Sequence, residues 1–364
     1  MAKQSEQYGL PQPLSDALSP EQCTALRATG AQVDEIGQSQ EGRPLHGVSV
    51  GARHAPLVTI VAGAHPDEPA GPLAALQLLR LWSQSPLARQ VRLAVVPLLD
   101  VDGVVAQRQW LQPWREPVDL SLLQEHRLRR LPGEDREFAW PGAPWSGPVL
   151  PECRAAADFF TDQGGPIAHC SLHGMLVAAG AWFLLNRPAL RDAQLWRDLR
   201  GIAADQHFGL HDMPRHGEKG FRRVGDGFCT VPSGPAMRRW WCAQQQSPST
   251  APGGFAWGSM DFARHLARRH GLDDPLCAVS EFPLLRWRHC HGRSLSWMRE
   301  HLPAVLQDPA GPLPAMPVSG GQLQAMPVSG GQLQAMPMQS LVTAMVAMVE
   351  AVIAAALRRT RMRL

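Results

Sequence analysis

Short apolar runs alternate with longer segments of helical spacing along most of the chain. Runs short enough for buried strands are 47–51, 57–62, 91–98, 167–172, 181–185 and 278–282. Segments that favour helices are 20–29, 70–83, 151–161, 190–208, 259–270 and 294–306. Short apolar strands between helices predict an α/β fold, with a mixed, mostly parallel sheet covered by helices on both faces.

Two connections in this pattern are long. Residues 102–150 and 209–258 are rich in Gly, Pro, Trp and Arg. Long loops on a rigid sheet commonly carry functional residues. We therefore expect part of any site to come from these two segments.

The last fifty residues differ from the rest. A ten-residue unit, 315–324, repeats at 325–334, and a third copy fails after Pro337. Two copies containing Pro and Gly-Gly are too few for a solenoid and predict a flexible linker. The apolar run 341–357 then predicts a helix that covers the core, because it is short for a membrane span and contains Glu350. The predicted organisation is a main domain over 1–310, a linker over 311–340 and a terminal helix over 341–364.

Composition limits the function classes. The 364 residues are 45% apolar, enough for a sizeable core, and the net charge of +3 does not favour nucleic-acid binding. Seven scattered cysteines without CxxC spacing indicate a reducing compartment. The polar N-terminus lacks the core of a signal peptide, so we expect a cytoplasmic protein without a membrane partner.

The strand-like run 57–62 ends at a turn that carries His65 and Glu68. An imidazole and a carboxylate this close can supply two zinc ligands, and a catalytic zinc site usually has three protein ligands and a water. His173, which ends another apolar stretch, is the candidate third ligand; His169 lies earlier, inside that strand. Taken alone, His173 could equally be a hydrogen-bonded core histidine, but the His65/Glu68 pair favours a ligand.

A zinc-activated water needs a base, and Glu281 is a single carboxylate within an apolar strand. The alternative for Glu281 is a structural ion pair with an arginine such as Arg286. Arg136 could hold a substrate carboxylate through its two-pronged guanidinium, and Arg115 could stabilise an oxyanion.

The order of these motifs resembles the zinc carboxypeptidase family, with its succinylglutamate desuccinylase and aspartoacylase relatives. The likeness extends over about residues 40–285. The segments that carry it are Glu41-Gly42-Arg43-Pro44-Leu45, Gly63-Ala64-His65-Pro66-Asp67-Glu68, Pro97-Leu98-Leu99-Asp100-Val101-Asp102-Gly103, Trp114-Arg115, Asp135-Arg136-Glu137-Phe138, Pro151-Glu152-Cys153-Arg154-Ala155, Ser171-Leu172-His173-Gly174 and Ser280-Glu281-Phe282-Pro283.

The resemblance implies a single carboxypeptidase-like domain that binds one Zn²⁺ ion. It implies His65, Glu68 and His173 as metal ligands. It also implies Glu281 as the general base and Arg115 as the residue that polarises the scissile carbonyl.

Three positions depart from the family pattern. Asp135 replaces the asparagine that, with the arginine aligned to Arg136, grips the substrate carboxylate, and Asp135 would repel a carboxylate unless it is paired or turned away. Asp100-Val101 replaces Asn-Pro. The tyrosine that many members bring over the substrate has no equivalent, because the only tyrosine is Tyr8.

These features predict a zinc-dependent carboxypeptidase-type peptidase that acts on a peptide. An N-acyl-amino-acid deacylase on the same scaffold is the first alternative, and residues 40–285 do not separate the two. A non-catalytic binding protein is the second. Arg/Trp patches at 238–241 and 286–288 could stack on nucleic-acid bases, but the near-neutral charge favours solvated loops.

Overall fold

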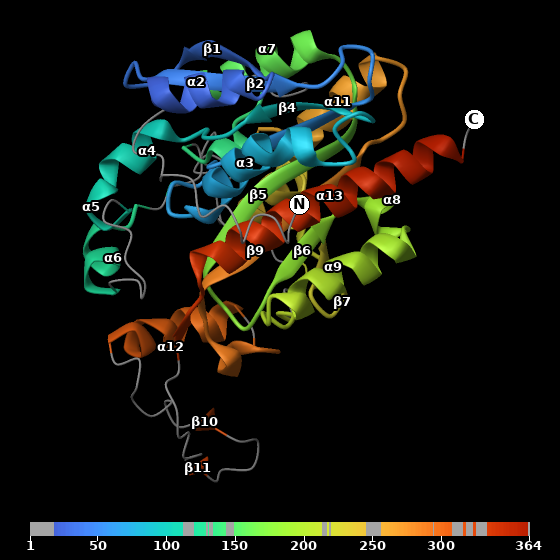
Figure 1. Ribbon diagram of the computed structural model, residues 1–364. Coiled ribbons are helices and arrows are strands. Elements are labelled where there is room, and N and C mark those ends of the chain that lie inside the picture. The colour runs from blue at the N-terminus through green and yellow to red at the C-terminus, as the bar shows by residue number, and fades with distance from the viewer. Residues whose placement is uncertain are drawn as a thin grey trace.

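The computed structural model describes residues 18–111, 120–128, 130, 134–142, 149–212, 217, 220–244, 256–293, 295–307, 316–317, 323–324 and 333–362. Its centre is a mixed sheet with helices on both faces (Figure 1). The predicted α/β architecture is therefore confirmed.

The ten-stranded sheet has the order β1-β2-β4-β3-β5-β9-β6-β8-β7, and β12 pairs with β9. Its four central strands, β4, β3, β5 and β9, are parallel, and antiparallel pairs flank them. The strands are β1 (Gln32–Gln38), β2 (Pro44–Val50), β3 (Leu57–Ala62), β4 (Arg92–Val96), β5 (Pro166–Ala178), β6 (Trp182–Leu185), β7 (Arg223–Gly225), β8 (Phe228–Thr230), β9 (Leu276–Arg286) and β12 (Gln334–Ala335). The short strands β10 (Met316–Pro317) and β11 (Leu323–Gln324) pair only with each other.

The helices form two layers. Helices α3, α9 and α13 pack together on one face of the sheet, and α7 and α11 pack on the other (Figure 1). The helices are α2 (Pro20–Ala28), α3 (Ala70–Leu81), α4 (Val101–Ala106), α5 (Arg108–Leu111), α6 (Leu120–His126), α7 (Pro151–Gln163), α8 (Arg187–Leu190), α9 (Ala193–Asp205), α10 (Gly234–Gln244), α11 (Ser259–Arg269), α12 (Leu295–Gln307) and α13 (Met338–Arg361). Short 3₁₀ turns are η1 (Trp82–Gln84), η2 (Arg136–Phe138) and η5 (Arg288–Cys290).

Strand β3 explains why the central strands read as continuous apolar runs. Val58, Ile60 and Ala62 belong to the apolar core that includes α3 and α13. Leu57 and Val61 belong to the core on the opposite face, with α7 and α11. Because successive side chains point to opposite faces, a strand covered on both sides needs apolar residues at nearly every position.

The C-terminal helix begins at Met338, three residues before the predicted start, and belongs to the main core. By length and composition α13 could cross a bilayer, but much of its apolar surface packs inside the protein, against α3 and α9. Just before the helix, β12 pairs with the end of β9. Residues 333–340, assigned to the linker, thus join the sheet and the helix layer.

Three further differences from the predicted elements have local causes. The helix expected over 190–208 corresponds to α9, which begins only at Ala193 because Asp192 caps it by accepting from the Leu195 amide, and Leu190 ends the separate helix α8. The long connection 102–150 contains α4, α5, α6 and η2, and 209–258 contains β7, β8 and α10. Strand β1 was not expected, because only Val33 in its mixed sequence is buried.

Candidate metal centre and active site

The turn after β3 places two predicted metal ligands at the carboxyl edge of the sheet. Gly63 begins the turn with φ +64°, a conformation that favours glycine. Helix α3 starts after Glu68, and a Cβ on Gly71 would lie 2.4 Å from the Leu172 carbonyl oxygen of β5. The first turn of α3 therefore touches β5 directly, which brings Glu68 beside His173.

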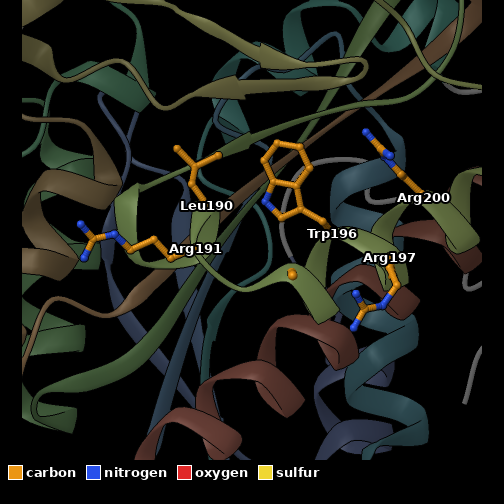
Figure 2. Close-up of a pocket in the computed structure, with 6 residues that line it drawn as sticks. Leu190, Arg191, Trp196, Arg197 and Arg200 are labelled. Carbon is orange, nitrogen blue, oxygen red and sulfur yellow. The ribbon is translucent and has the colours of Figure 1, made fainter.

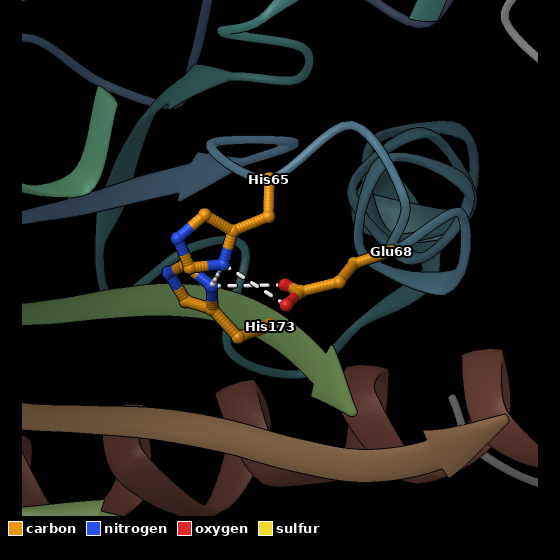
Figure 3. Close-up of side chains that lie close together, drawn as sticks. All are labelled: His65, Glu68 and His173. Atoms are coloured by element: carbon orange, nitrogen blue, oxygen red, sulfur yellow. Dashed lines mark hydrogen bonds and ion pairs between the residues drawn. The ribbon is translucent and has the colours of Figure 1, made fainter. Parts of the chain in front are cut away.

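The side chains of His65, Glu68 and His173 converge on one point (Figure 3). The Nδ1 atoms of the two histidines lie 3.1 Å apart. Glu68 Oε1 lies 2.9 Å from His65 Nδ1, and Glu68 Oε2 lies 3.0 Å from His173 Nδ1. The predicted ligand set is thus assembled from β5 and the turn that follows β3.

These three donors fit a zinc ion. Zinc bonds to nitrogen and oxygen are about 2.0–2.2 Å long, so tetrahedral donors lie about 3.3 Å from one another. The two imidazole nitrogens lie 3.1 Å apart, and the Glu68 carboxylate places Oε1 2.9 Å from one of them and Oε2 3.0 Å from the other. Two imidazoles and one carboxylate are also a ligand set that catalytic zinc sites use.

The site is electrostatically prepared for a cation. Burial lowers the pKa of His173, but the carboxylates of Glu68 and Glu137 outweigh it and raise the pKa to about 10. Burial also lowers the pKa of His65, and Glu68 with Asp135 raises it well above the usual value. Glu68 shows the reverse, since burial raises its pKa and the two histidines bring it below the usual range. The carboxylates of Glu68, Asp135 and Glu137 stabilise positive charge on the two histidines in the metal-free protein, and they would stabilise the charge of Zn²⁺ in the same way.

Both ligand histidines have a carboxylate on the side away from the metal position. His65 Nε2 lies 3.2 Å from Asp135 Oδ1. His173 Nε2 lies 3.2 Å from Glu137 Oε2 and 2.9 Å from Ser171 Oγ. Asp135 is therefore paired with His65, and this pairing reduces the repulsion predicted from the sequence between Asp135 and a substrate carboxylate.

Glu281 lies on the strand next to His173. The parallel strands β5 and β9 place these two residues directly opposite each other, so their side chains share one face. Glu281 is half-buried, whereas its neighbours Ser280 and Phe282 are fully buried. The guanidinium of Arg286, the proposed structural partner, donates instead to the carbonyls of Ala179 and His207.

Arg136, which was predicted to hold a substrate carboxylate, is buried in this structure. Its side chain is 1% exposed, and its guanidinium nitrogens lie 3.1 Å from Glu152 Oε1 and 3.5 Å from Asp100 Oδ1. It also donates to Gln40 Oε1 and to the Glu134 carbonyl. The cause is the pair of buried carboxylates behind it, which draw the cation inward.

The remaining predicted residues divide into two groups. Arg115, the candidate for the oxyanion, and Tyr8 lie outside the described residues. His169 is buried inside the sheet, where its ring nitrogens contact Thr59 Oγ1 and Ser259 Oγ. This hydrogen-bonded core position agrees with the interpretation that His169 is not a ligand.

Sequence reasoning missed the roles of Glu137 and Ser171. Glu137 stands out in the sequence only as part of a motif, although the four charged residues in a row before Phe138 (134–137) are costly to bury without partners. Ser171 lies midway between His169 and His173, and this spacing of two along a strand places all three side chains on one face. That alternation was a usable signal.

A separate hollow lies on α8 and α9 (Figure 2). Its volume is about 270 Å³, and its lining residues are Leu190, Arg191, Ala193, Trp196, Arg197 and Arg200. The guanidinium of Arg200 stacks over the Trp196 and Phe228 rings. This lining has no carboxylate, imidazole or thiol that could bind a zinc ion.

Comparisons with known proteins agree with this geometry. The family model described as zinc carboxypeptidase matches residues 22–128, which include His65 and Glu68. No curated protein matches the sequence significantly.

Two crystal structures of proteins described as "putative metallopeptidase" share the fold. The one from Shewanella denitrificans has a TM-score of 0.51 and 16% identity, over 92% of this chain and 86% of that chain. The one from Shewanella amazonensis has a TM-score of 0.50 and 16% identity, over 91% and 89%. The predicted resemblance to the zinc carboxypeptidase family is confirmed by the family model over residues 22–128, and the fold is shared with the two putative metallopeptidases over most of the chain.

Proposed function

We propose that the protein is a member of the zinc carboxypeptidase family that hydrolyses an amide bond in a peptide or an N-acyl amino acid. One observation carries the proposal. Two imidazole nitrogens and a carboxylate lie within 3.1 Å of one another at a strand edge, and Glu281 stands in register with one of the ligands. A binding protein without catalysis has no need of this base beside the three ligands.

Each residue then has a definite task. His65, Glu68 and His173 would hold Zn²⁺, which when bound lowers the pKa of a water and polarises a carbonyl. Glu281 accepts a proton from the attacking water and returns it to the leaving amine, as a general base and then a general acid. Arg115 remains the predicted stabiliser of the oxyanion.

Recognition of the substrate carboxylate is not assigned to Arg136, because its guanidinium is committed to Asp100 and Glu152. Peptidase and deacylase activity therefore remain two alternatives, and each is tested with its own substrates. The protein is assayed against peptides with a free C-terminus, the same peptides amidated, and N-acyl amino acids.

The decisive experiment combines zinc analysis with one substitution. We expect one zinc ion per chain and turnover of one of the three substrate classes. Glu281→Gln keeps the zinc and lowers kcat by about 10²–10⁴-fold, because the amide cannot accept the proton. Turnover by Glu281→Gln at the wild-type rate would remove Glu281 from the mechanism, and a zinc-loaded wild type without turnover would favour the binding protein.

A further inference from the structure

The segment Asp135-Arg136-Glu137 distributes its three charges in two directions. Asp135 caps the short η2 turn by accepting a hydrogen bond from the Glu137 amide. Asp135 and Glu137 reach the two ligand histidines, and Arg136 between them points into the interior. Arg136 thus anchors the segment to the protein interior, while Asp135 and Glu137 on either side of it contact the metal-ligand histidines.

Glu137 is held more tightly than its contact with His173 alone requires. The residue is 4% exposed. Its Oε1 accepts a hydrogen bond of 2.6 Å from Ser259 Oγ at the start of α11, and its Oε2 accepts one of 3.1 Å from Ser171 Oγ. Ser259 in turn contacts His169, which contacts Thr59 of β3. The carboxylate is therefore fixed by groups from β5 and α11, and Thr59 of β3 supports this network through His169.

This fixed carboxylate determines which nitrogen of His173 can bind a metal. A carboxylate can only accept, so an N–H group of His173 faces Glu137 at Nε2. When the imidazole gives up its other proton to bind a metal, the lone pair is on Nδ1, the atom 3.0 Å from Glu68 Oε2. His65 has the same arrangement, with Nε2 toward Asp135 and Nδ1 toward Glu68. Partners of this kind orient ligand imidazoles and strengthen metal binding.

We propose that Asp135-Arg136-Glu137 is a metal-positioning clamp, in which Glu137 orients His173 and Arg136 anchors the segment, and not a clamp for the substrate carboxylate. The proposal rests on the proposed function, since it requires His65 and His173 to be ligands. Glu137 acts through His173 and does not itself need to touch substrate.

The test measures zinc affinity by competition with a chelator. Glu137→Gln keeps the size of the side chain but removes the charge that orients His173, and we expect zinc to bind about 10–100-fold more weakly. Glu134→Gln is the matched control, because Glu134 is exposed in the same segment and its substitution makes the same change in charge. We expect its zinc affinity to equal that of the wild type.

Two further readouts separate positioning from general damage. The melting temperature of the metal-free Glu137→Gln protein measures the loss of stability by itself, and the visible spectrum of the cobalt-substituted protein reports a change in His173 geometry. Ser259→Ala removes the 2.6 Å hydrogen bond to Oε1 together with the contact to His169 Nε2, while Glu137 keeps its charge, and we expect zinc affinity to fall about threefold or more. It also decides the case if Glu137→Gln does not fold.

The outcomes distinguish the clamp from the proposed function. Zinc binding that is unchanged in Glu137→Gln, or unchanged in Ser259→Ala if the first variant fails to fold, overturns the clamp. If His173→Ala itself still binds zinc with wild-type affinity, then the ligand set, and with it the proposed function, is wrong. Loss of zinc in His173→Ala together with weaker binding in Glu137→Gln supports both.

Discussion

The two faces of strand β5 have opposite chemistry. Ala168, Cys170 and Leu172 face the apolar core that includes α3 and α13. The alternate residues His169, Ser171 and His173 are equally buried, but they contact hydroxyls and carboxylates of β3, η2 and α11. One strand thus supports both the interior packing of the protein and its candidate metal site.

The difference teaches how each face is stabilised. Apolar packing is non-directional, so a substitution there costs stability in proportion to the volume removed. A buried polar network depends on each donor and acceptor, because a group that loses its partner keeps its desolvation cost. We therefore expect substitutions on the apolar face to change stability alone, and those on the polar face to change metal binding as well.

The largest effect is expected for His173→Ala, on the polar face. Removing one of three protein ligands should abolish tight zinc binding and lower turnover at least about a thousandfold. Zinc analysis after gel filtration measures the first effect, and the substrate assay measures the second. One zinc ion per chain in this variant would contradict the assigned ligand set.

The local pattern of the sequence was sufficient to predict strand β3 and the three candidate metal ligands. Strand β3 was predicted with its observed bounds, because both of its faces are covered and every residue is apolar or small. His65 and Glu68 could be identified because they share one turn. His173 could be identified because parallel strands end at the same edge of the sheet.

The parts that could not be predicted depend on contacts between distant segments. The inward orientation of Arg136 is caused by Asp100 and Glu152, and a sequence motif does not give the direction of a side chain. Glu137 becomes a partner of His173 only when η2 lies against β5. A motif can therefore identify the ligands of a site before it identifies the groups that orient them.

The second largest effect is expected for the buried ion pairs of Arg136, where a substitution should strongly lower the free energy of unfolding. Arg136→Met leaves the fully buried Glu152 without its cation, whereas Asp100 keeps its ion pair with Arg130, and we expect a loss of about 4 kcal/mol in the free energy of unfolding. Arg268→Met is the control, because Arg268 pairs with Asp274 but its side chain is 53% exposed; such a pair contributes less than about 1 kcal/mol. Urea titration of both variants measures the contrast. Equal losses would show that burial does not matter at Arg136.

The apolar layer should respond in stability only. Ile353 is fully buried in α13, and Ile353→Ala is expected to lower the free energy of unfolding by about 3 kcal/mol through the cavity it leaves. Met362→Ala, at a residue that is 80% exposed just after the helix, should change it by less than about 0.5 kcal/mol. Zinc affinity should be unchanged in both variants. A tenfold change in zinc affinity in Ile353→Ala would show that the two faces of the sheet are coupled.

The smallest effect concerns His169, which lies on the polar face but away from the metal. Burial lowers the pKa of His169 to about 4, with a smaller contribution in the same direction from His173, although the Glu137 carboxylate acts in the opposite direction. Between pH 6.5 and 4 the unfolded chain therefore binds a proton that the folded protein does not, and stability falls as the pH falls. From pH 7 to 5.5 the expected loss is about 1 kcal/mol, given an unfolded pKa of about 6.5. Urea titrations of the metal-free wild type and of His169→Gln isolate this contribution, because the other titrating groups are common to both. Parallel pH profiles for the two proteins would show that folding does not lower the pKa of His169.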